Sequence, residues 1–227
     1  LAAAILAIAA VACVRAPRPT GYLENYGGLL PQPPPYTSVY GERTAAGRQP
    51  RVDNVLQILP SRWNAEQLPR SLGEADLLDL LDNRLRVYLL RSTPSSVIVT
   101  RSRDVNDFVE AGANVTQLRV SITDTKRGIG LVRMLIGFQL GATELQVEGW
   151  LVDLETSKVL VRFARRGAHD GAVYGLPTPQ SLSPTYCWRL SVDETAAMLA
   201  RYVASQLTPP PPHWWENLST PRGLPRE

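Results

Sequence analysis

Residues 142–165 carry the pattern that most restricts the fold of this chain. Polar and apolar residues alternate along 144–151, apolar residues recur at every second position from 159 to 163, and the polar residues 153–158 separate these arms. Period-two alternation places every second side chain on one face of a strand, and Asp, Thr and Ser favour turns. We therefore predict a β-hairpin. Its inward side is expected to hold Leu145, Val147, Gly149, Leu151, Val159, Val161 and Phe163.

Two amphipathic helices are predicted from capping boxes. Ser71 and Ser191 are each followed three residues later by a glutamate, so that the two side chains can satisfy backbone amides at a helix start. Apolar residues then recur at steps of three and four, which places them on one face of a helix. The first stripe is Leu78, Leu81, Leu85 and Leu89, and the second, which ends before Pro209, is Val192, Ala196, Leu199 and Val203.

The remaining elements indicate one α/β domain, with an α+β arrangement as the alternative. Strands are expected at residues 55–59, 97–99 and 118–122, and a short helix at 104–111. A chain of 227 residues with 44% hydrophobic content suits a single domain. We expect a mixed or antiparallel sheet of about five strands packed by the two main helices in residues 52–207, with extended tails at both ends.

The first thirteen residues form an apolar, alanine-rich run that ends at Cys13. The run is too short to span a bilayer and has the length of a signal-peptide core. We expect residues 1–12 to be a signal peptide, truncated at its start because neither an initiator Met nor a basic segment precedes it. The alternatives are a buried helix and an uncleaved anchor. Residues 13–51 are rich in proline and predict an extended tether, within which the apolar cluster 21–30 is expected to dock.

Three features resemble an uncharacterised Gram-negative lipoprotein family of unknown function. They are the Ala10-Val11-Ala12-Cys13 lipobox, the Gly-Tyr-Leu-x-x-Tyr segment that begins at Gly21, and the Asp-x-x-Thr hairpin turn, in which Ser157 occupies the usual glycine position. The resemblance implies that Cys13 is acylated, for instance by palmitate, and that the mature chain is tethered to a membrane. Val14 stands where inner-membrane lipoproteins often carry Asp. The resemblance therefore implies the periplasmic face of the outer membrane.

Two apolar segments are candidate contacts with a partner or a membrane. Residues 128–141 are too short to span a bilayer and too apolar for a solvated loop, although an ordinary core segment is the alternative. The tail 208–227 combines prolines with adjacent indoles, which could pack on the domain, lie at a membrane interface or meet a partner. The contact residues that we predict are Ile129, Leu131, Met134, Leu135, Phe138, Trp214 and Trp215.

No catalytic, metal or cofactor site is predicted. Cys13 and Cys187 are the two cysteines, and with Cys13 lipidated no disulfide remains, so Cys187 is expected to be buried and inert. Two distant histidines, His169 and His213, do not form a zinc site, and a Ser-His-Asp arrangement lacks a nucleophile motif. The sequence Gly128-Ile129-Gly130 lacks the third glycine of a dinucleotide loop. We therefore do not expect an enzyme.

Two functional classes remain after these exclusions. In the first, the protein is a non-catalytic envelope component that assembles with other proteins or with copies of itself. In the second, it is a small-ligand or cell-wall-binding module that uses a basic face around Arg162, Arg165 and Arg166. The net charge of +3 comes from scattered arginines rather than from a basic stripe, which does not favour nucleic acid as a partner.

Overall fold

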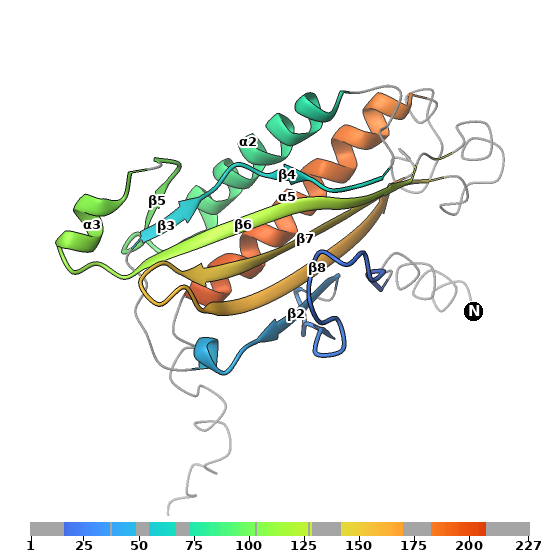
Figure 1. Cartoon of the computed structure of the whole chain (residues 1–227). Helices are drawn as coiled ribbons and strands as arrows, with labels where there is room; N and C mark the ends of the chain where they lie inside the picture. The colour runs from blue at the N-terminus through green and yellow to red at the C-terminus, as the bar shows by residue number, and fades with distance from the viewer. Residues whose placement is uncertain are drawn as a thin grey trace, which may run out of the picture.

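The computed structural model describes residues 16–36, 38–48, 55–66, 73–102, 104–126, 128, 142–169 and 183–207. Their strands form one mixed sheet in the order β1-β2-β8-β7-β6-β3-β5, with β4 also paired to β6 (Figure 1). The strands are β1 (Leu30–Pro31), β2 (Val39–Arg43), β3 (Val55–Ile58), β4 (Arg62–Trp63), β5 (Ile98–Thr100), β6 (Val115–Lys126), β7 (Thr143–Asp153) and β8 (Val159–His169). The helical elements are α2 (Glu74–Ser92), α3 (Asn106–Glu110), α5 (Pro184–Leu207) and the 3₁₀ turn η1 (Ala46–Arg48).

The predicted α/β class is confirmed, but the sheet is larger than expected. Eight strands replace the expected five among the described residues, because β1, β2 and β4 were not predicted. The sheet is mixed, since β3 runs parallel to both β5 and β6, while β7 is antiparallel to its two neighbours β6 and β8.

The predicted hairpin is confirmed as β7 and β8, which pair from Thr143↔His169 to Val152↔Val159. The hydroxyl of Thr156 donates to the Asp153 carboxylate at 2.6 Å within the turn. Ser157 adopts φ 55°, the left-handed conformation that glycine normally supplies. Serine therefore supplies the left-handed residue of the turn, although the glycine is missing.

Both long helices pack on one face of the sheet, and their predicted starts need correction. Helix α2 begins at Glu74 with Gly73 as its N-cap and without a side-chain cap, and Leu77 rather than Leu78 is the buried first member of its stripe. Helix α5 begins at Pro184 instead of Ser191, which is buried in mid-helix. The Ser183 hydroxyl accepts a hydrogen bond from the Tyr186 amide at 3.3 Å, and proline suits the first helical position.

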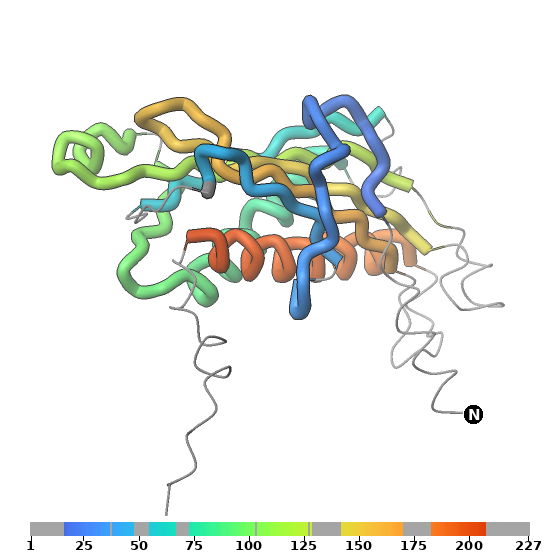
Figure 2. The backbone as a smooth tube through the Cα atoms, turned by 90° about the horizontal axis from the view of Figure 1, so that it is seen from below, coloured from blue at the N-terminus to red at the C-terminus, as the bar shows by residue number. Residues whose placement is uncertain are grey.

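The segment expected to be a tether is part of the fold where it is described. Strand β2 pairs with β8 along five residues, from Val39↔Arg165 to Arg43↔Val161. Residues 16–30, which we call the strap, cross the sheet on the face opposite α5 (Figure 2). The prediction that folding begins at residue 52 is therefore wrong. Within the described ranges, no helix has both the length and the apolar character needed to cross a membrane.

Candidate functional site

The predicted contact residues and the lipidation site lie outside the described residues. This applies to Cys13, to all five candidates between Ile129 and Phe138, and to both Trp214 and Trp215. The lipidation site and the contact residues therefore remain predictions. Cys187, in contrast, is described and is fully buried in α5, as expected.

The apolar half of the strap docks on the sheet, as predicted for residues 21–30. Leu23 and Leu29 are buried in a small cluster with Ala164 of β8. The ring of Tyr22 stacks on that of Trp150, with centroids 4.8 Å apart and planes 11° from parallel. The partner that we expected for this cluster is therefore the protein's own sheet.

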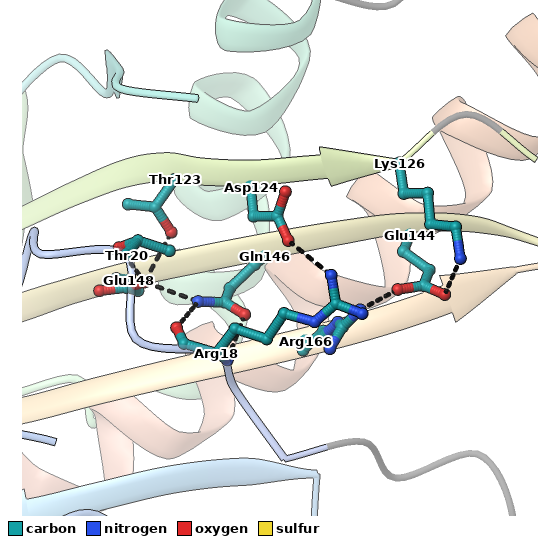
Figure 3. A network of polar contacts seen from close by, with 9 residues as sticks. All are labelled: Arg18, Thr20, Thr123, Asp124, Lys126, Glu144, Gln146, Glu148 and Arg166. Atoms are coloured by element: carbon teal, nitrogen blue, oxygen red, sulfur yellow. Dashed lines mark hydrogen bonds and ion pairs between the residues drawn. The ribbon is translucent and has the colours of Figure 1, made fainter. Parts of the chain in front are cut away.

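The polar half of the strap meets a buried carboxylate, Glu148 of β7, which has no exposed surface. Its oxygens accept hydrogen bonds from Thr20 at 2.8 Å, Thr123 at 2.7 Å and the Gln146 amide at 2.7 Å (Figure 3). The hydroxyl of Tyr26 donates a fourth at 2.6 Å. The hydroxyl of Tyr26 also accepts from the backbone amides of Thr20 and Leu23. All four donors to Glu148 are neutral, so hydrogen bonds rather than an opposite charge compensate for its burial.

The start of the strap is fixed by a second buried side chain, Gln146. Its amide nitrogen donates to the Arg18 carbonyl at 2.7 Å, and its oxygen accepts from the Arg18 amide at 2.8 Å (Figure 3). The Arg18 guanidinium lies 3.9 Å from the Asp124 carboxylate. The side chain of Gln146 thereby pairs with the Arg18 backbone as a neighbouring strand would.

Beyond Gln146, an ion-paired group lies at the end of the sheet where β6 finishes. Glu144 pairs with Arg166, and both are buried, while Lys126 lies 3.6 Å from the same carboxylate (Figure 3). The Arg166 Nε atom is buried without a hydrogen-bond partner. Removing one member of such a pair would leave an uncompensated charge.

On the other side of Glu148, an aromatic and basic row crosses three strands. Arg119 of β6 is the register partner of Trp150, and Trp150 is the register partner of Arg162 in β8. Arg62 of β4 pairs with Ser121, two residues beyond Arg119. We call Tyr22, Trp150, Arg62 and Arg119 the strap-face patch.

The electrostatic environment of Tyr22 reflects this row. Burial raises the pKa of Tyr22, and the nearby Glu148 acts in the same direction. Arg62, Arg119 and a hydrogen bond with Ser121 act to lower this pKa. The phenol is therefore close enough to both exposed guanidinium groups and to the buried carboxylate for their charges to affect its pKa.

The basic face expected around Arg162, Arg165 and Arg166 does not exist. Arg165 is buried toward α5, where it pairs with Glu194 at 2.7 Å and donates to Thr195, and its burial lowers its pKa. Arg166 lies on the opposite face and pairs with Glu144. Adjacent residues of a strand point to opposite faces, so Arg165 does not share the face of Arg162 and Arg166, and the three arginines do not form one basic face.

Sequence reasoning missed the network around Glu148. The alternation of Glu144, Gln146 and Glu148 with apolar residues predicts a solvated outer face, and no local signal shows that residues more than a hundred positions earlier cover it. Across the described ranges, no group of three His, Cys, Asp or Glu side chains is arranged to hold a metal ion.

Comparison with known proteins finds one family match over part of the chain and several distant structural similarities. Residues 98–173, which are 76 of the 227, match a domain of unknown function (DUF4410). No curated protein matches the chain. Three similar solved structures are a PelC dodecamer from Paraburkholderia phytofirmans, protein XCC0632 from Xanthomonas campestris and hypothetical protein CT253 from Chlamydia trachomatis.

These structural similarities are distant. For PelC the identity is 13%, the coverage is 74% of this chain and 96% of that chain, and the TM-score is 0.42. XCC0632 is 12% identical, with coverage of 70% of this chain and 88% of that chain and a TM-score of 0.40. CT253 is 12% identical, with coverage of 68% of this chain and 99% of that chain and a TM-score of 0.43. Such identities and TM-scores carry no information on function. Over about a third of its length, the chain is similar to a family whose role is unknown.

Proposed function

We propose that this protein is a lipid-anchored, non-catalytic component of the cell envelope that assembles with other proteins or with copies of itself. Cys13 carries the lipid, and the periplasmic face of the outer membrane is the proposed address. The observation that supports this proposal most directly is the attachment of the strap to the sheet through Glu148 and Gln146.

The strap sets how far the body can stand from a lipid on Cys13. Arg18, whose backbone is held by Gln146, comes five residues after Cys13. Five extended residues span at most about 18 Å. An acylated Cys13 would therefore hold the sheet close to a leaflet, in a restricted orientation, instead of releasing it on a long tether.

The flanks of the apolar segment 128–141 emerge at the same end of the sheet. Lys126 ends β6, Thr143 begins β7, and Arg18 lies beside Asp124, two residues before Lys126. We propose that Ile129, Leu131, Met134, Leu135 and Phe138 contact a partner or the membrane at this end.

The aromatic tail would act at the other end. It follows Leu207 of α5, and the neighbouring Gln206 accepts a hydrogen bond from Arg43, at the far end of β2. A helix of 24 residues is about 36 Å long. Trp214 and Trp215 therefore belong to a separate proposed contact.

Lipidation is tested by Cys13→Ser in the full-length protein. We expect the product to leave the membrane fraction and to lose the mass of the acyl groups in mass spectrometry. Cys187→Ala is the matched control, because it removes the other cysteine from a buried position and should leave fractionation unchanged. Unaltered fractionation and mass in Cys13→Ser would contradict the anchor.

Assembly is tested by mild crosslinking of envelopes and by the size of the detergent-extracted protein. We expect a species much larger than the 25.0 kDa monomer. Single cysteines placed at residues 129, 134 and 138 should be protected from a thiol reagent in that species and reactive in the dilute monomer. Protection in the monomer would assign the segment to the core and remove it from the proposed contact.

A further inference from the structure

We infer that the strap-face patch binds an acidic glycan. The stacked rings of Tyr22 and Trp150 would receive the apolar face of a sugar, and Arg62 and Arg119 would bind its carboxylate groups. The choice of a glycan rests on the proposed envelope location, because an exported protein meets surface polysaccharides rather than nucleic acids.

The geometry gathers the four side chains on one face of the sheet. Arg119 and Trp150 are register partners, and Ser121, the partner of Arg62, follows Arg119 at the spacing that returns to the same face. Directly opposed side chains begin about 5 Å apart and diagonal ones about 7–8 Å apart. The two guanidinium groups therefore lie beside one aromatic stack, on the face that the strap crosses. Figure 2 shows the strap and α5 on opposite sides of the sheet.

No described carboxylate forms an ion pair with either arginine, and the nearest one on this face, Glu148, is buried under the strap. Arg62 and Arg119 are exposed, and neither forms an ion pair with a described residue, although Arg119 donates to the Gln117 side chain at 2.8 Å. The buried arginines of the same sheet are paired instead, Arg165 with Glu194 and Arg166 with Glu144. Guanidinium groups bind carboxylates through two parallel hydrogen bonds, so Arg62 and Arg119 are suited to a carboxylated ligand.

The row continues to a hollow at its far end. Arg162, on the other side of Trp150, lines a cavity of about 480 Å³ together with Lys158 and Thr44. Its guanidinium lies 3.8 Å from Glu42 and 3.9 Å from Glu24, so its charge is largely compensated. The uncompensated charge therefore stays at the Arg62 and Arg119 side, and the cavity offers room for a chain that extends past the rings.

Two other anionic partners fit less well. Nucleic acid carries one phosphate per nucleotide and is bound tightly by proteins that make about 6–10 phosphate contacts, whereas this patch offers two uncompensated cations. A flat anionic membrane would also meet Glu24, which is 93% exposed beside the patch. An acidic glycan is narrower than a membrane and more sparsely charged than nucleic acid, so it matches the small basic area.

Binding is tested with the full-length protein in detergent, with polygalacturonate as the probe and its methyl ester as the uncharged analogue. We expect saturable binding to the acid and loss of binding to the ester. The double variant Arg62→Gln/Arg119→Gln should weaken binding by at least about tenfold. Arg86→Gln/Arg91→Gln is the matched control, because it removes two exposed arginines from α2 and should retain the affinity of the unmodified protein.

Several results would overturn the inference. These are no binding to polygalacturonate, equal losses in both double variants, or equally strong Arg62- and Arg119-dependent binding to oligo-dT or to phosphatidylglycerol in mixed detergent micelles. If the double variant shows an altered circular dichroism spectrum, Arg62→Gln alone replaces it, with an expected partial loss. The assay needs no membrane, so it decides glycan binding even if Cys13→Ser shows that the anchor is wrong.

Discussion

At the scale of single residues, Glu148 and Tyr26 decide how the strap is held. Glu148 is a buried carboxylate surrounded by neutral donors, and Tyr26 both donates to it and accepts from two strap amides. When a buried polar group loses its hydrogen-bond partners, the folded state is destabilised, because folding has already removed the water that would replace them. Glu148 and Tyr26 are therefore expected to contribute much of the free energy that holds the strap on the sheet.

Tyr26→Phe should lower the free energy of unfolding by about 2 kcal/mol, the usual range for a hydrogen bond to a charged group. The ring stays in place, so the loss reports the hydroxyl. Urea denaturation measures it. Tyr40→Phe, in the same apolar cluster, is the control and should change stability little. Equal effects of the two substitutions would show that the Glu148 contact contributes nothing specific.

Alkaline pH should destabilise the protein through Tyr202. Burial raises the pKa of Tyr202 above its ordinary value near 10, with its hydroxyl packed against Gly41. The neutral phenol is favoured in the folded state, so this contribution is complete below pH 10 and is lost as pH rises further. Thermal melts between pH 9 and 12 should show a falling midpoint. Tyr202→Phe should reduce the fall, and an unchanged pH dependence would contradict this role.

At the scale of elements, one buried ion pair joins the sheet to its covering helix. Arg165 of β8 is 3% exposed in its side chain and pairs with Glu194 of α5, which is 54% exposed. Loss of the glutamate leaves a buried charge unpaired, whereas loss of the arginine leaves a carboxylate in water. The two halves of the pair are therefore not equivalent.

Glu194→Ala should cost about 2 kcal/mol of stability although the side chain is half exposed. In a double-mutant cycle, Arg165→Met combined with Glu194→Ala should cost less than the sum of the single changes. The exposed pair of Arg84 and Asp193 at 3.1 Å, which joins α2 to α5, is the control and should couple by less than about 1 kcal/mol. If the two single changes have additive effects on the free energy of unfolding, the ion pair between Arg165 and Glu194 does not itself stabilise the fold.

At the scale of the whole molecule, the strap and the sheet differ in how they are held. The central strands and the two helices share one large apolar core, while the strap contributes Leu23 and Leu29 to a much smaller cluster. Segments with few buried apolar contacts open at lower free energy than the core. The strap is therefore expected to open before the rest of the fold.

Hydrogen exchange should distinguish opening of the strap from opening of the core. Amides of residues 16–30 should exchange faster than those of β7 and α5, and Glu148→Ala should accelerate exchange in the strap while α5 keeps its protection. The reason is that four hydrogen bonds converge on Glu148, two of them from the strap. Mass spectrometry of peptides from the two regions measures this. Uniform acceleration in both regions would mean that strap and core open as one unit.

The sequence by itself determined the elements whose pattern is local. The β7–β8 hairpin follows from period-two alternation, and the leucine stripe of α2 follows from helical spacing. The left-handed conformation of Ser157 in the hairpin turn was decided by the structure. Local patterns were less reliable at element starts. The serine at 191 resembled a cap, but the apolar face of α5 continues back to Trp188, and the true start is Pro184.

Only the tertiary structure decided the role of residues 16–43 and the composition of the candidate sites. Prolines in this region predict a tether, yet β2 completes the sheet and the strap buries Glu148, because each finds partners more than a hundred residues away. Contacts between residues distant in the sequence likewise unite Tyr22, Arg62, Arg119 and Trp150 in one patch. Sequence periodicity shows which face of an element is apolar, but long-range packing determines what covers the polar face.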